Sequence, residues 1–177
     1  MKIFYSNPYS IEKNFGKAIN EFCELVPEDA WIVIQDGDIT YLTPDWGTII
    51  YNTLKENGDK FGLIGCFTGR LSVKGQLHEG LFSDNHNILD HIEIAKDYSS
   101  TEIKEVHHPI AGMFMAFRKS TWTKLKGFKE NTYSFDVDFS VRVRAAGMKI
   151  GLMQGVYVYH QYRPLSKNPK EDIKHLK

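Results

Sequence analysis

An apolar run that ends in two acidic residues constrains this chain more than any other stretch. Residues 31–34 are short, β-branched and bounded by polar segments, which is typical of a buried strand. Asp36, Gly37 and Asp38 follow, so two carboxylates are expected at the rim of a sheet, where open α/β folds bind ligands. Two oxygen ligands this close together suit a hard divalent cation. The alternative is a solvated hairpin turn, because Asp-Gly is also a strong turn signal.

The composition allows one globular domain. The chain has 177 residues, of which 42% are hydrophobic and 25% charged, as in ordinary folded proteins. Its 22 basic and 22 acidic residues balance, so no net charge attracts nucleic acid. Cys23 and Cys66 are expected to be reduced core thiols, with a single disulfide left open. Without a signal-peptide pattern or a membrane-spanning run, we expect a cytoplasmic location.

Hydrophobic periodicity predicts strands and helices in alternation. Ser10 is the expected cap of the first helix, and Thr43 that of the second, with Pro44 at its first position. The first two strands and the helix between them form a βαβ unit, which implies parallel pairing. Residues 68–105 have weak periodicity and are expected to form a functional excursion. The predicted strands are residues 2–5, 31–35, 61–67, 109–118 and 150–159, and the predicted helices are residues 11–26, 44–57, 122–128 and 139–146.

Four segments in order resemble the family 2 glycosyltransferases. Residues 14–20 are similar to the helix before that family's acidic motif, and residues 36–44 to its D-x-D motif and the start of the next helix. Residues 110–130 resemble the strand and "G-G-F-D-E" turn behind the sugar pocket. Residues 135–160 resemble the closing "E-D-x-D-x-x-x-R … G … H" pattern, with Phe135 in place of the usual glutamate. Relatives usually open with a further βα unit, so this chain is a short variant.

The resemblance implies an α/β, single-domain GT-A fold: a three-layer sandwich around a mostly parallel sheet, over residues 1–163. Residues 164–177 would form a polar tail. The implied activity is metal-dependent, inverting transfer of a sugar from a UDP- or GDP-sugar donor to a hydroxyl of a saccharide or glycolipid acceptor. Surface polysaccharide synthesis is the commonest context of such relatives. A peripheral position at the inner face of the membrane and a homo-oligomer stay open.

The same resemblance implies roles for individual residues. Asp36, Asp38 and His160 would hold Mn²⁺ or Mg²⁺, and the imidazole favours Mn²⁺. The two aspartates would also belong to donor binding, and Asp136 would be the general base that takes the acceptor proton. Further donor-binding positions are Asn14, Lys17 and Arg163.

Each role has a plainer alternative. His160 can be an ordinary strand-end histidine, and Asp136 can merely cap a helix. Asp138 lies four residues before Arg142, so we predict a helical ion pair rather than a catalytic role. Five other histidines match no zinc spacing: His78, His86, His91, His107 and His108.

Two rival functions remain. Residues 36–40 also resemble the D-x-D-x-T signature of haloacid-dehalogenase-type phosphatases, in which the first acid is a nucleophile and the second a proton donor. That fold needs its motif on the first strand and a later acidic pair preceded by a lysine. A non-catalytic GT-A homologue that binds a sugar nucleotide is the other rival, and the shortened first half favours it.

Overall fold

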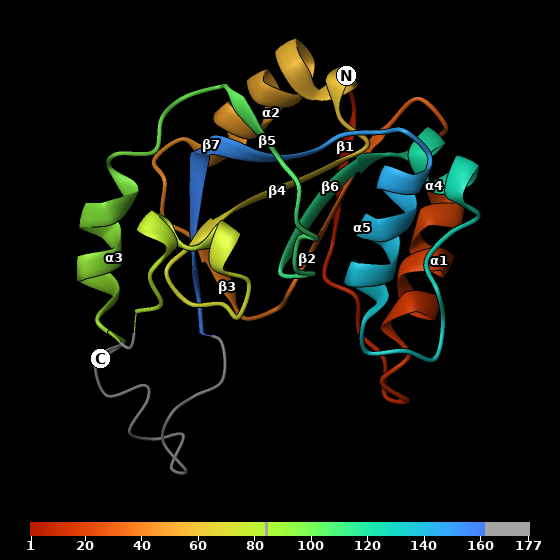
Figure 1. Cartoon of the computed structure of the whole chain (residues 1–177), viewed down its shortest axis with the longest axis horizontal. Helices are drawn as coiled ribbons and strands as arrows, with labels where there is room; N and C mark the ends of the chain where they lie inside the picture. Colours follow the sequence, from red (N-terminus) through yellow and green to blue (C-terminus); the bar gives the residue numbers. More distant parts are fainter. Residues whose placement is uncertain (84, 162–177) are drawn as a thin grey trace.

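The computed structural model describes residues 1–83 and 85–161. Within these residues, one seven-stranded sheet carries the strands in the order β1-β2-β6-β4-β7-β3, and β5 pairs with β7 (Figure 1). The strands are β1 Ile3–Ser6, β2 Trp31–Gln35, β3 Ile39–Tyr41, β4 Leu63–Thr68, β5 Ile103–Val106, β6 Phe114–Arg118 and β7 Ile150–His160. The α-helices are α1 Phe15–Leu25, α2 Trp46–Asn57, α3 Ile88–Ala95, α4 Lys119–Leu125 and α5 Phe135–Ala145.

Four of the seven strands share one direction. The pairs β1–β2 and β4–β7 are parallel, and β6 is antiparallel to both β2 and β4. β3 and β5 run antiparallel to the long strand β7. The predicted parallel unit of β1, α1 and β2 is confirmed. The prediction of an α/β fold around one sheet in which most strands share a direction is also confirmed, although most neighbouring pairs are antiparallel.

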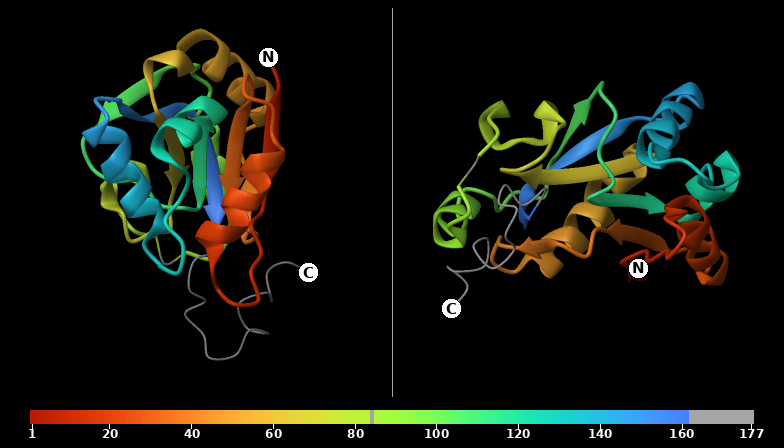
Figure 2. Two further views of the ribbon diagram at one scale, coloured as in Figure 1. Left: turned by 90° about the vertical axis from the view of Figure 1, so that its right-hand side faces the viewer. Right: turned by 90° about the horizontal axis from the view of Figure 1, so that it is seen from below.

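Two hydrophobic cores lie on opposite faces of the sheet. Ile32 and Ile34 of β2 belong to the core under α1 and α5, whereas Trp31 and Val33 belong to the core under α2. This alternation follows from the two-residue period of a strand. Figures 1 and 2 show α1, α4 and α5 together on one side of the sheet. The result is the three-layer arrangement predicted from the sequence.

The helix starts differ from those predicted. α1 begins at Phe15 because Asn14, not Ser10, accepts the capping hydrogen bond, from the Lys17 amide. The Ser10 hydroxyl instead accepts from the Asn14 amide at 2.9 Å. In the same way, Thr43 does not cap α2. Its hydroxyl accepts from the main-chain amide of Tyr157 in β7, and the helix begins only at Trp46.

No residue range was predicted for three short elements: β3, α3 and β5. β3 has only three residues, too few for their alternation to indicate a strand, and their strand conformation depends on pairing with β7. Cys23 and Cys66 are both free and buried, as predicted for core thiols. No helix among the described residues is long and apolar enough to cross a membrane. Arg163 and the predicted tail, residues 164–177, lie outside the described residues.

Candidate active site

Strand pairing brings the acidic motif and His160 to one edge of the sheet. β2 ends at Gln35, Asp36 and Asp38 follow, and the chain returns at once as β3. β3 pairs with the end of β7 so that Ile39 lies opposite His160. The Gln161 amide also donates to the Asp38 carbonyl, which fixes the acidic loop against the end of β7.

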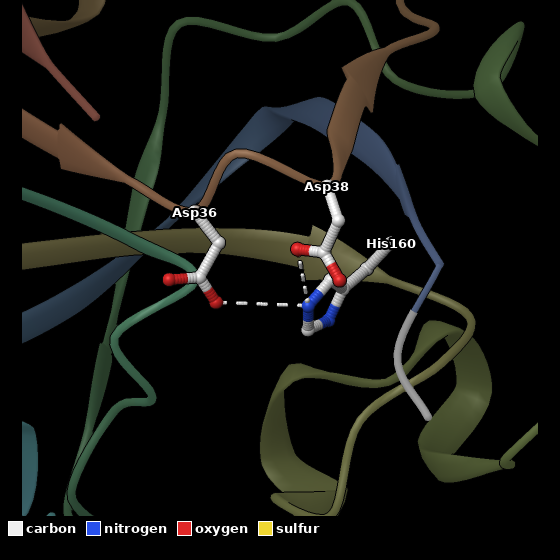
Figure 3. A group of neighbouring side chains, drawn as sticks. All are labelled: Asp36, Asp38 and His160. Atoms are coloured by element: carbon white, nitrogen blue, oxygen red, sulfur yellow. Dashed lines mark ion pairs between the residues drawn. The ribbon is translucent and has the colours of Figure 1, made fainter. Parts of the chain in front are cut away.

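The three side chains point toward one another (Figure 3). His160 Nε2 lies 3.6 Å from Asp36 Oδ2 and 3.3 Å from Asp38 Oδ1. One ligand atom from each residue falls within 4.8 Å of the other two. The imidazole is buried, whereas the two carboxylates are about half exposed. His160 is therefore not the exposed strand-end histidine of the plainer alternative.

The carbonyl of Arg70 sets the orientation of the imidazole. His160 Nδ1 lies 3.1 Å from this oxygen, and because a carbonyl only accepts, Nδ1 carries the proton of the hydrogen bond. Nε2 is left to face the two carboxylates. Arg70 is itself fully buried, and its guanidinium donates to the Ser83 carbonyl at 3.0 Å. A main-chain acceptor that fixes the far nitrogen is a common support for a metal-binding histidine.

The two carboxylates differ in their electrostatics. The hydrogen bond from His160 lowers the pKa of Asp38 below its usual value. Burial raises the pKa of Asp36, and the nearby charges of Asp38 and Asp136 add to this increase, while His160 opposes it. Neighbouring acids with pKa values moved in opposite directions are typical of functional sites.

Asp136 lies in the same cleft as the acidic motif. The cleft has a volume of about 460 Å³. Asp136 accepts hydrogen bonds from two main-chain amides, that of Gly112 at Oδ2 (2.9 Å) and that of Val137 at Oδ1 (2.8 Å). Asp136 lies in the first turn of α5, so its hydrogen bond from the Val137 amide is the capping contact of the plainer alternative, and the hydrogen bond from Gly112 is an additional contact. The cleft is lined by Asp36, Asp38, Leu71, Ser72, Ala111, Gly112, Met113, Tyr133, Phe135, Asp136 and His160.

Asp138 takes no part in this cleft. α5 begins at Phe135, four residues earlier than predicted, so both of its aspartates lie in the first turn. Asp138 Oδ2 accepts from Arg142 Nε at 2.7 Å, which confirms the predicted ion pair. The Arg142 guanidinium also donates to the Leu125 and Gly127 carbonyls. Asp138 therefore helps to hold α5 onto the end of α4.

Two of the other predicted donor-binding residues, Asn14 and Lys17, do not line the cleft. Asn14 and Lys17 line a separate hollow on the outer side of α1, and Lys17 forms an exposed ion pair with Glu21. Arg163 is outside the described residues. Sequence reasoning missed Gly112, although its position beside an apolar strand and its lack of a side chain are the signal of a close approach. A Cβ there would lie 2.9 Å from the Phe135 ring.

The excursion 68–105 contributes packing and one side of the cleft. His91 is buried, Nε2 donates to the Asn85 carbonyl, and Nδ1 accepts from the Tyr157 hydroxyl. His78 pairs with the Tyr98 hydroxyl at 2.9 Å. Among the described residues, the Asp36, Asp38 and His160 group is the one that gathers enough ligand atoms to hold a metal ion. Its oxygens and imidazole nitrogen fit a divalent cation such as Mn²⁺.

A comparison with profiles of protein families assigns the chain to a family. The profile described as glycosyl transferase family group 2 matches residues 31–168, which is more than half of the chain. This chain belongs to glycosyl transferase family group 2. The match runs from β2 through the acidic motif, the excursion and α5 to the end of β7, so it contains every residue that lines the cleft. No curated protein matches the sequence. The GT-A type fold and the glycosyltransferase assignment thus agree.

Proposed function

We propose that this glycosyltransferase moves a sugar from a UDP- or GDP-sugar to an acceptor hydroxyl with inversion, using Asp36, Asp38 and His160 to hold Mn²⁺ or Mg²⁺. The observation that supports the proposal is the cleft, in which the three candidate ligands and Asp136 lie together. Family membership supplies the reaction class. Metal use, the nucleotide and the stereochemistry are the proposal.

The residues of the cleft divide the chemistry between them. A divalent cation bound there would supply Lewis-acid stabilisation of the charge on the leaving diphosphate. Asp38 would be the direct ligand, as the family resemblance implies, and His160 Nε2 lies 3.3 Å from its Oδ1. Asp136, oriented by the Gly112 amide, accepts the proton of the attacking hydroxyl. Attack from the side of Asp136, opposite to the leaving group, inverts the anomeric carbon.

A thermal-shift titration tests the metal and nucleotide parts. We expect stabilisation by Mn²⁺ together with UDP or GDP, and its loss in Asp38→Asn and His160→Ala. Asp45→Asn is the control for the acid, because Asp45 has a left-handed φ of 54° that Asn also tolerates, and it lies outside the cleft. Exposed His107 offers His107→Ala as the control for the histidine. Equal stabilisation of all four variants would reject the proposed metal site.

The rate of donor hydrolysis tests the proposed role of Asp136 as the general base. With a donor that the wild-type protein hydrolyses, we expect Asp136→Asn to bind Mn²⁺ and nucleotide normally while turnover falls by about 10²–10⁴-fold. Asp138→Asn removes the same charge from the same turn of α5 and should retain turnover, since that side chain pairs with Arg142 outside the cleft. Full activity of Asp136→Asn would rule out its role as the base.

A sugar-nucleotide-binding protein without turnover is the second candidate. β1 is the edge strand of the described sheet and pairs with β2 alone, at the place where the family resemblance implies a further βα unit. Such a protein would show the metal-dependent nucleotide stabilisation but no donor hydrolysis or transfer. The phosphatase alternative lacks support, because the family match is to glycosyltransferases. In addition, no lysine is among the described residues that line the cleft.

We also propose that the protein works in the cytoplasm, or peripherally at the inner face of the membrane, in surface polysaccharide synthesis with a saccharide or glycolipid acceptor. Two free, buried cysteines are compatible with a reducing compartment. Fractionation of cells that express the protein, before and after a high-salt wash, distinguishes the two locations. A homo-oligomer remains a proposal that light scattering checks.

A further inference from the structure

The side chain of Asn14 makes contacts that a donor-binding role does not require. It is 7% exposed. Its carbonyl oxygen accepts from the Lys17 amide at 3.2 Å and from the Asn131 amide at 3.0 Å, and its NH₂ group donates to Asn131 Oδ1 at 3.0 Å. Asn14 therefore joins the first turn of α1 to the turn formed by residues 127–131, which lies between α4 and α5.

Asn20 makes the corresponding contact one and a half turns farther along α1. Its oxygen accepts from the Phe128 amide at 2.7 Å and from Trp122 Nε1 at 3.0 Å. Its NH₂ group donates to the Phe128 carbonyl at 3.0 Å and to Glu130 Oε1 at 3.2 Å. All four hydrogen-bonding positions of the amide are occupied. The two asparagines thus hold both ends of the 127–131 turn.

Gly16 allows the backbone of α1 to pack directly against the backbone of the 127–131 turn. A Cβ on Gly16, between the two asparagines, would lie 2.1 Å from the Lys129 carbonyl oxygen. Asn131 and Gly127 both have positive φ, 54° and 79°, so the turn has a specific backbone conformation that the asparagine contacts stabilise. The contact between α1 and the 127–131 turn therefore depends on specific residues of both segments.

The 127–131 turn leads directly into the element that carries Asp136. Three residues after Asn131, Ser134 precedes α5, and its amide bonds to Thr132 Oγ1 at 3.2 Å. Phe135 then packs on Phe15 of α1, with ring centroids 6.1 Å apart. Figure 1 shows α1 and α5 starting at the same end of the sheet, where β2 passes into β3. The position of the first turn of α5 is therefore set from α1.

We propose that Asn14 and Asn20 are positioning residues: by holding the 127–131 turn against α1, they place Asp136 opposite Asp36 and Asp38 across the cleft. This inference rests on the proposed function of Asp136 as the base. For Asn14 it replaces the donor-binding role that the sequence resemblance implied. Neither asparagine lines the cleft. Both act through the turn, so neither needs to contact a substrate.

A double-mutant cycle on Asn14 and Asn131 tests the proposal. Asn14→Ala removes the helix-side amide, and Asn131→Gly removes the partner side chain while tolerating the positive φ. Calorimetry with Mn²⁺ and UDP or GDP gives nucleotide affinity, and hydrolysis of the matching nucleotide sugar gives kcat and KM. We expect each single variant to lower kcat about tenfold or more with unchanged donor KM. Because they break one contact, the double variant should be little worse than either.

Two controls separate positioning from general destabilisation. Asn14→Asp keeps a side-chain oxygen that accepts from the Lys17 and Asn131 amides, and the Asn131 side chain can rotate to donate to the new carboxylate, so kcat should be rescued. Asn57→Ala removes another part-buried asparagine bond, to the Thr101 carbonyl, at the other end of the sheet. It should lower the melting temperature as Asn14→Ala does but leave kcat unchanged.

Three results would overturn the inference. A tenfold or greater loss of nucleotide affinity in Asn14→Ala, with no effect of Asn131→Gly, would return Asn14 to donor binding. A fall in kcat in Asn57→Ala equal to that in Asn14→Ala would show only general destabilisation. Failure of the wild-type protein to bind either nucleotide would reject the proposed function, and the positioning role with it.

Discussion

His160 stabilises the ionised form of Asp38, with Nε2 3.3 Å from Oδ1, although the two residues belong to opposite ends of the sequence. The contact exists because Ile39 pairs with His160 across β3 and β7. The first two predictions follow from this relationship.

Acid should destabilise the protein partly through Asp38. Its folded-state pKa is lowered from 3.8, so its contribution to stability is complete above that value and is lost as the pH falls through the lowered pKa. We expect Asp38→Asn to flatten the acid side of the curve of unfolding free energy against pH. Urea unfolding at a series of pH values between about 3 and 7 measures this. The prediction fails if both proteins lose stability in parallel on acidification.

Asp36 should behave in the opposite sense. Burial raises its folded-state pKa, so its ionisation opposes folding above that pKa and this cost disappears as the pH falls. Asp36→Asn should raise the melting temperature near neutral pH by about 1–2 °C, a small effect because the side chain is 45% exposed. Scanning calorimetry without metal tests this, and a lower melting temperature for the variant would contradict it.

Gly112 should be needed to orient Asp136. In Gly112→Ala the new Cβ would lie 2.9 Å from the Phe135 ring, and the ring or the first turn of α5 must shift. Because the Gly112 amide bonds to Asp136 Oδ2, we expect turnover to fall by about tenfold or more while Mn²⁺ affinity holds. Single-turnover kinetics and metal titration measure the two effects. A normal kcat in Gly112→Ala would contradict the prediction, because it would show that Asp136 keeps its orientation despite the added Cβ.

Two helical glycines should respond oppositely to alanine. Gly16→Ala places a Cβ 2.1 Å from the Lys129 carbonyl, a main-chain atom that cannot move easily, so we expect a loss of about 2 kcal/mol or more. Gly47 lies at the same early position of α2 with no atom within 4 Å of the added Cβ. Gly47→Ala should therefore stabilise the protein by about 0.5–1 kcal/mol. Denaturant unfolding measures the free energy of unfolding of both variants. A similar loss of stability in both would refute the packing argument.

Features that depend on a local pattern of residues could be predicted from the amino-acid sequence. The β-branched run before Asp36 specifies β2, and the period of the apolar residues specifies most of α1, because a buried face repeats with the geometry of its own element. The order of the motifs predicted the glycosyltransferase family, and the spacing of Asp138 and Arg142 predicted their ion pair. The strand, helix and ion-pair signals each lie within about ten residues, and the family motifs, which span residues 14–160, are recognised by their order along the chain, so no tertiary information was needed.

How these helices, strands and loops meet depends on contacts between distant parts of the chain. Asn14 caps α1 in place of Ser10 because Asn131 lies beside it, and Thr43 bonds to β7 instead of capping α2. The pairing of β3 with β7 brings His160 to the acidic motif, and the Gly112 amide orients Asp136. Each of these contacts joins residues distant in the chain. Their hydrogen bonds depend on strand register and helix packing, which a local pattern of apolar and polar residues does not contain.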